Sequence, residues 1–179
     1  MRYHLGYTVN LIMTSKDTLN KNKIIFVELD DSDLPAPSHE AQQERKVAIF
    51  DLLEDNYFKP LRNDNMIPYE GPYKILIAIR DQRLTIKIFS NEDILLREIL
   101  LSLSPLRQIL KDYTEICSSY YNAVKRLAPS QIETIDMGRR AIHDEGGKIL
   151  MQRFDRKVEM DIPTSRRLFT LITALYLEN

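Results

Sequence analysis

The residues most able to do chemistry lie in one short segment, DMGRRAIHDEGG, at positions 136–147. His143 could act as a general acid or base, because an unperturbed imidazole titrates near neutral pH. Arg139 could clamp a phosphate or a carboxylate, since a guanidinium offers paired donors to either group. Asp144 and Glu145 follow the histidine directly and could assist it or pair with the arginines. The segment is therefore compatible with an acid-base site, an anion clamp or a group of structural ion pairs.

Helical spacing separates Arg139 from the other charges. Ser130 and Glu133 form a capping box, which predicts a helix that begins after Pro129. This helix has an apolar line that contains Ile132, Ile135, Arg139, Ile142, Gly146 and Ile149. A guanidinium in such a line cannot lose its charge, so it must reach solvent, pair with a carboxylate or face a cavity that holds an anion.

The remaining charges of the segment have simpler interpretations. Arg140 has Asp136 one turn before it and Asp144 one turn after it, which predicts an ion-pair ladder on the helix surface. His143 is placed to act as a cation near the helix C-terminus, and Gly146 to supply a left-handed C-cap. The helix is therefore expected to end near Gly146.

A second basic pair, Arg166 and Arg167, falls in the first turn of the last predicted helix. Positive charge there opposes the helix macrodipole, so an acidic side chain or a bound anion should compensate it. Asp161 and Glu159 are candidate acidic partners nearby in sequence, and Asp144 and Glu145 are candidates that the fold could bring near. If instead both basic pairs converge on one anion, the predicted ligand-binding residues are Arg139, His143, Arg166, Arg167, Asp144 and Glu145.

Other kinds of site are disfavoured by the sequence. The chain has three histidines, His4, His39 and His143, none of them paired at the spacing of metal ligands, and it has one cysteine, Cys117. Neither a nucleophile elbow nor a glycine-rich phosphate loop occurs in it. We therefore predict no metal site, no cofactor and no catalytic residue; if the protein is an enzyme, His143 is the acid-base group.

The middle of the chain predicts a small antiparallel sheet. YKILIAIR at 73–80 and RLTIKIF at 83–89 alternate apolar and polar residues on either side of an Asp-Gln turn, which is typical of a β-hairpin. ILLREILLSL at 94–103 is expected to add a third antiparallel strand, and KIIFVEL at 23–29 has the composition of a strand. The sheet should therefore have three to four strands.

Four or five helices are expected to cover this sheet. One of them, over 39–56, has a broad apolar face that comprises Val47, Ile49, Phe50, Leu52 and Leu53. A long helix opens at Ser104 and carries an apolar stripe that runs to Val124 and Leu127 and is expected to lie in the core. Cys117 falls on this stripe, so it is interpreted as a packed thiol and not as a nucleophile. The charged helix follows, then a short helix over 148–156 and a final one over 164–176, which is expected to bury Leu168, Leu171, Ile172 and Leu175. The predicted fold class is α+β.

Composition limits the class of protein. The chain carries 25 basic and 26 acidic residues, so no global charge attracts nucleic acid or an anionic membrane. The charge is uneven, because residues 28–55 hold nine acids and two bases whereas residues 138–167 hold eight bases and five acids. The single cysteine favours a reducing compartment, the cytoplasm, and the longest apolar run, LFTLITALYL, is too short to span a bilayer.

The N-terminal residues differ from the rest of the chain. Residues 1–22 show no clear period and are rich in Asn, Lys, Thr and Ser, which predicts a mobile leader, and Met13 is an alternative start to Met1. Residues 23–179 are then expected to form a single globular α+β domain of ordinary size.

Four long strings carry a resemblance to a known family. They are ERKVAIFDLLEDNYFKP, LSLSPLRQILKDYTEICSSYY, PSQIETIDMGRRAIHDEGG and TSRRLFTLI, in this order. Together they resemble an uncharacterised protein family of alphaproteobacteria, number two hundred and sixty-two among such families. The resemblance covers the chain from about Lys23 to its end. It implies a bacterial cytoplasmic protein and supplies no activity, substrate or catalytic residue.

Three functions stay open. The leading hypothesis is a non-catalytic cytoplasmic domain that binds a protein partner or a small anionic ligand through Arg139, His143, Arg166 and Arg167. The second is a small enzyme that acts on a phosphorylated or carboxylated substrate, with His143 as acid-base and the arginines as clamps. The third is weak nucleic-acid binding, in which the glycine pair separates two helices of a helix-turn-helix and the basic segment contacts DNA.

Overall fold

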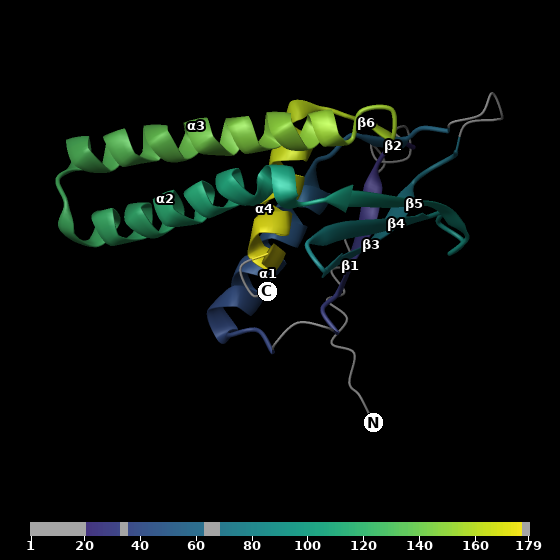
Figure 1. Cartoon of the computed structure of the whole chain (residues 1–179), viewed down its shortest axis with the longest axis horizontal. Helices are drawn as coiled ribbons and strands as arrows, with labels where there is room; N and C mark the ends of the chain where they lie inside the picture. Colours follow the sequence, from purple (N-terminus) through teal and green to yellow (C-terminus); the bar gives the residue numbers. More distant parts are fainter. Residues whose placement is uncertain (1–20, 33–35, 63–68, 177–179) are drawn as a thin grey trace.

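The computed structural model describes residues 21–32, 36–62 and 69–176, so the predicted leader, apart from its last two residues, lies outside the described ranges. Within these ranges, a four-stranded sheet and four α-helices confirm the predicted α+β class. Figure 1 shows the helices gathered on one side of the sheet, with two of them drawn out into a long hairpin.

The sheet has the strand order β1-β3-β4-β5. Its strands are β1 (Ile24–Asp30), β3 (Tyr73–Arg80), β4 (Arg83–Phe89) and β5 (Leu95–Ser102). The last three pair antiparallel in succession, as the alternating pattern predicts. β1 pairs with β3 in parallel, which requires the chain to cross over before it re-enters the sheet.

One face of the sheet is apolar because its strands alternate in register. Ile77 of β3 lies opposite Ile86 of β4, which lies opposite Ile99 of β5, and none of the three is more than 2% exposed. The turn between β3 and β4 consists of Asp81 and Gln82, with positive φ angles of 49° and 59°, as a two-residue hairpin turn requires. This face forms the sheet side of the hydrophobic core.

The helices are α1 (His39–Glu54), α2 (Arg107–Arg126), α3 (Pro129–Arg153) and α4 (Ile162–Tyr176). A 3-10 turn, η2 (Ser104–Leu106), leads into α2, and β2 (Phe58–Pro60) pairs antiparallel with β6 (Val158–Met160) in a second small sheet. α4 is the central helix, because it packs on both α1 and α3 and buries Leu168, Phe169, Leu171, Ile172 and Leu175. In the described ranges, no helix is both long and apolar enough to cross a bilayer.

α3 does not end at Gly146, and the predicted break between two helices at this point is wrong. The helix continues to Arg153 because the glycines allow α4 to approach closely. A Cβ on Gly146 would overlap the ring of Phe169, and a Cβ on Gly147 would lie 2.7 Å from Cγ of Arg166. Tertiary packing therefore outweighs the low helix propensity of glycine.

The start of α3 also differs from the predicted capping box. Ala128 is the N-cap, and its backbone N–H donates to the side chain of Gln131 at 3.3 Å. Pro129 takes the first helical position, where its missing N–H is not needed. Ser130 consequently lies inside the helix, and Gln131, not Glu133, is the side chain that reaches back to the cap.

α2 and α3 form an antiparallel hairpin whose outer part extends beyond α4 (Figure 1). The apolar stripe predicted for α2 is buried at Tyr113, near the sheet. It becomes exposed at Val124 and Leu127, near the hairpin turn, so the prediction of a core position there is wrong. Between these points Gly138 of α3 faces Ile116 of α2 with ordinary van der Waals spacing.

Candidate functional site

Arg139, whose partner the sequence leaves open, is paired inside its own helix. Its Nε and one terminal nitrogen donate to the same oxygen of Asp136, at 2.9 and 2.7 Å. The guanidinium carbon also lies over the ring of Tyr120, 5.2 Å from the ring centroid. Arg140 contacts the second Asp136 oxygen at 2.5 Å, and the hydrogen bond from Arg139 holds the pKa of this carboxyl below its usual range. Arg139 is therefore one half of a structural ion pair.

His143 is a packed residue in the middle of α3, so the predicted helix end at this position is wrong. Its ring stacks on Tyr113 with 5.1 Å between centroids and 16° between planes. Nε2 lies 3.0 Å from the carbonyl oxygen of Arg166 and 2.9 Å from Oγ1 of Thr170. A carbonyl can only accept, so we assign the proton to Nε2, which leaves Nδ1 to accept from the Arg166 guanidinium at 3.4 Å. Burial lowers the pKa of His143, and the neutral imidazole holds α3 against α4.

The second arginine pair is divided between two partners. Arg166 places its Nε 3.0 Å from Oδ1 of Asp144, one of the acidic partners considered from the sequence. Arg167 donates to the backbone carbonyl of Asp55 and lies 3.5 Å from its carboxylate. Asp55 is the C-cap of α1, where a cation is favoured by the helix macrodipole. Glu145, next to Asp144 in sequence, is exposed on α3.

The six residues predicted as one ligand-binding face are thus only partly together. His143, Asp144 and Arg166 meet at the interface of α3 and α4. Arg139 is paired one turn away within α3, and Arg167 is bound to the end of α1. The positive charges of Arg139, Arg166 and Arg167 have partners within the protein, so the fold does not require an external anion at these arginines. The binding of such an anion stays a prediction.

A separate hollow of about 480 Å³ opens between α1, α2 and α4, and we call it the α1–α2 groove. Its walls are one side of α1 and one side of α2, and α4 forms its floor. Small side chains leave the space open, because Ala48, Thr173 and Ala174 all line it. The volume is typical of sites that hold a ligand or a partner side chain.

The rim of the α1–α2 groove is apolar and acidic. Val47 on the α1 wall is 50% exposed and Tyr121 on the α2 wall is 60% exposed, so both walls present large apolar groups to solvent. Glu44 and Asp51 also line the α1 wall, about one turn to either side of Val47. Neither carboxylate forms an ion pair with any residue of the described ranges.

The groove and the charged cluster share two side chains. Tyr113 stacks on His143 and also lines the groove, and Thr170 contacts Nε2 of His143 and also lines the groove. Burial raises the pKa of Tyr113 and of the Cys117 thiol, so both groups are uncharged at neutral pH. A protonated, half-buried thiol is a poor nucleophile, which agrees with the interpretation of Cys117 as a packed thiol. The structure adds that this thiol lines the groove.

The chemistry that the groove offers is recognition. It provides apolar contacts, the hydroxyl and amide groups of Ser118 and Asn122, and two carboxylates. Among the described residues, no group of three or more His, Cys, Asp or Glu side chains could hold a metal ion. The arrangement is therefore suited to binding an apolar or cationic group.

This groove was not predicted from the sequence. The sequence feature that indicates it is the apolar face of α1, which is wider than one buried side of a helix requires. Ile49, Leu52 and Leu53 of that face are buried, whereas Val47 and Phe50 remain 50% and 46% exposed. The surplus apolar residues on α1 indicate a second surface that the core does not cover.

The fold and the groove define a class of protein: a small α+β domain with a projecting helical hairpin and an apolar groove between α1, α2 and α4. The chain belongs to the uncharacterised protein family UPF0262, whose family model matches residues 21–178. This match confirms the family that the four sequence strings predict.

Three bacterial relatives are similar to the chain over nearly their whole length. The UPF0262 protein of Ruegeria pomeroyi is 54% identical over 159 residues, which are 88% of this chain and 98% of the relative. That of Dinoroseobacter shibae is 56% identical over 154 residues, 86% of this chain and 96% of the relative. That of Roseobacter denitrificans is 53% identical over 156 residues, 87% of this chain and 98% of the relative. No solved structure matches the chain.

Proposed function

We propose that the protein is a non-catalytic cytoplasmic domain that binds a partner protein in the α1–α2 groove. The observation that carries the proposal is the pair of apolar side chains Val47 and Tyr121, at least half exposed on the two walls of one hollow. Large apolar groups around a concavity are typical of interaction sites, because their burial in a complex releases water. Phe50, one turn from Val47 on α1, enlarges the exposed apolar surface of this helix.

A small enzyme that acts on a phosphorylated or carboxylated substrate has less support. Both nitrogens of His143 are engaged by groups of the protein, and burial keeps the imidazole neutral. The carboxylates of Glu44 and Asp51 would repel an anionic substrate from the groove. His143 therefore contributes to packing, and Glu44 and Asp51 favour a cationic over an anionic ligand.

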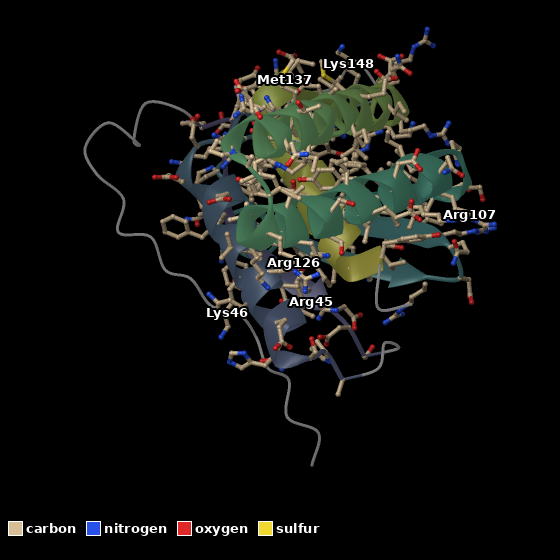
Figure 2. All side chains as sticks on the ribbon, turned by 90° about the vertical axis from the view of Figure 1, so that its left-hand side faces the viewer. Arg45, Lys46, Arg107, Arg126, Met137 and Lys148 are labelled. Atoms are coloured by element: carbon tan, nitrogen blue, oxygen red, sulfur yellow. The ribbon has the colours of Figure 1, made fainter. Side chains whose placement is uncertain are left out.

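Weak nucleic-acid binding also has less support. A helix-turn-helix would need the break at Gly146, and α3 is continuous there. Figure 2 shows Lys46, Arg107 and Lys148 projecting from different sides of the molecule. Basic side chains that point in different directions do not make one face that follows a phosphate backbone.

Site-specific photo-crosslinking tests the proposed function. A benzoylphenylalanine in place of Tyr121 puts the reactive group at the groove rim, and the same group in place of Leu100 on β5, which is 51% exposed, is the matched control. Both proteins are expressed in Ruegeria pomeroyi, which encodes a relative. We expect a light-dependent adduct of defined mass from the Tyr121 position, absent from the control and suppressed by Val47→Arg. No adduct from the groove position, or equal adducts from both positions, would refute the proposal.

A further inference from the structure

We infer that the segment bound in the α1–α2 groove is an amphipathic α-helix of a partner protein, with basic side chains flanking its apolar stripe. The inference rests on the proposed function and specifies the chemistry of the partner. Three features of the groove carry it: its helical walls, the spacing of its lining residues and the two acids of its α1 wall, which form no ion pair within the described ranges.

The first feature is that the walls and the floor are helices. Their backbone groups are bonded within each helix, so they offer no hydrogen-bond ladder to an extended peptide. An extended segment would bring unpaired N–H and C=O groups into an apolar hollow, which is unfavourable. A helical segment satisfies its own backbone and needs from the groove only side-chain contacts.

The second feature is the spacing of the lining residues. Glu44, Val47 and Asp51 follow one another at intervals of three and four on α1. On α2, Thr114 and Tyr121 lie two turns apart with Cys117 between them, at the same intervals. Each wall therefore presents a helical ridge about 10 Å long, at 1.5 Å per residue. A helix that lies between two such ridges can pack its own side chains, spaced by three and four, between the side chains of each ridge.

The third feature is the charge of the α1 wall. Glu44 and Asp51 are seven residues apart, so a partner helix with Lys or Arg at the same spacing can pair with both. The two basic residues of α1, Arg45 and Lys46, do not line the groove. Arg45 is buried and lies 2.9 Å from Asp31, and Lys46 projects from the outer side of the helix (Figure 2). The groove thus selects a cationic segment.

The test begins with the adduct formed at the Tyr121 position. Digestion and tandem mass spectrometry of this adduct identify the cross-linked segment, and a peptide of that sequence is then synthesised. We expect apolar residues at intervals of three and four, at least two Lys or Arg beside them, and a gain of helical circular dichroism when the peptide binds. An acidic or extended segment, or one that belongs to a second copy of this chain, would overturn the inference.

Charge variants of the α1 wall give the second arm of the test. Peptide affinity is measured by fluorescence anisotropy for the wild type, for Glu44→Gln with Asp51→Asn, and for Glu44→Lys with Asp51→Lys. We expect roughly threefold weaker binding for the neutral pair and on the order of tenfold or more for the reversed pair, because each exposed ion pair contributes modestly. Both acids are exposed, so the variants should fold as the wild type does.

The outcomes separate the two proposals. If the Tyr121 position yields no adduct, the proposed function itself fails. If it yields an adduct that Val47→Arg abolishes but that the reversed charge pair leaves unchanged, the groove binds a partner and the inference of a basic helix is refuted.

Discussion

Replacing Gly146 by alanine should destabilise the protein, although alanine is the better helix former by about 1 kcal/mol. The new methyl carbon would lie 2.7 Å from Cε2 of Phe169 and closer still to Cζ. Phe169 is fully buried and packs against Tyr113, so its ring has no free space into which to move. Forcing a group into a filled core costs about 1–3 kcal/mol or more. The overlap with three ring carbons places this cost in the upper part of the range, so after the gain in helix propensity we expect the free energy of unfolding to fall by up to about 2 kcal/mol.

The same helix contains a matched control. A Cβ on Gly138 would lie 3.8 Å from Cδ1 of Ile116, an ordinary contact, so Gly138→Ala should raise the free energy of unfolding by about 0.5–1 kcal/mol. Urea titration followed by far-UV circular dichroism measures both variants, and a thermal scan should show shifts of about 2–4 °C per kcal/mol in opposite directions.

Gly146→Ala and Gly138→Ala are expected to change the free energy of unfolding in opposite directions. If Gly146→Ala is as stable as the wild type, or if both variants shift in the same direction, then close packing of α4 on α3 does not explain the glycine. A further check uses Phe169→Leu, which removes the ring. In that background the destabilisation by alanine at Gly146 should shrink, because the two positions share one contact.

Three further predictions concern the charged cluster of α3 and the thiol of Cys117. Asp136→Asn should lower the free energy of unfolding, measured in urea, by about 1 kcal/mol, because Arg139 is then left partly buried without its carboxylate. Arg140→Ala, which removes the exposed partner of the same acid, should change the free energy of unfolding by less than about 0.5 kcal/mol. Equal effects of the two variants would contradict the assignment of Arg139 as the structural partner of Asp136. The melting temperature should fall as the pH drops below about 6.5, because burial disfavours protonation of His143 in the folded protein but not in the unfolded chain. In His143→Gln, thermal scans across this range should show a shallower dependence of the melting temperature on pH. A pH dependence equal to that of the wild type would contradict a neutral, buried imidazole. Iodoacetamide should alkylate Cys117 more slowly in the folded protein than in urea, as followed by mass spectrometry, and equal rates would argue against its burial.

Local pattern predicted those parts of the fold that depend on near neighbours. The alternation in 73–80 and 83–89 predicted the β3–β4 hairpin, because each residue of a strand selects a face by its position alone. The same reasoning predicted the α+β class and the buried apolar face of α4. It assigned Asp136 to Arg140 and left the partner of Arg139 open, whereas the structure shows this acid paired with both arginines.

Tertiary structure decided the features that depend on residues far apart in the chain. Arg167 and Asp55 are 112 residues apart, and Gly147 accepts a hydrogen bond from Ser165 of another helix at 2.7 Å. The parallel pairing of β1, the continuity of α3 and the opening between α1, α2 and α4 all follow from such contacts. By itself the sequence determined the family, the fold class and most elements. It could not determine which charges meet or where space is left, because both depend on how close the finished helices lie to one another.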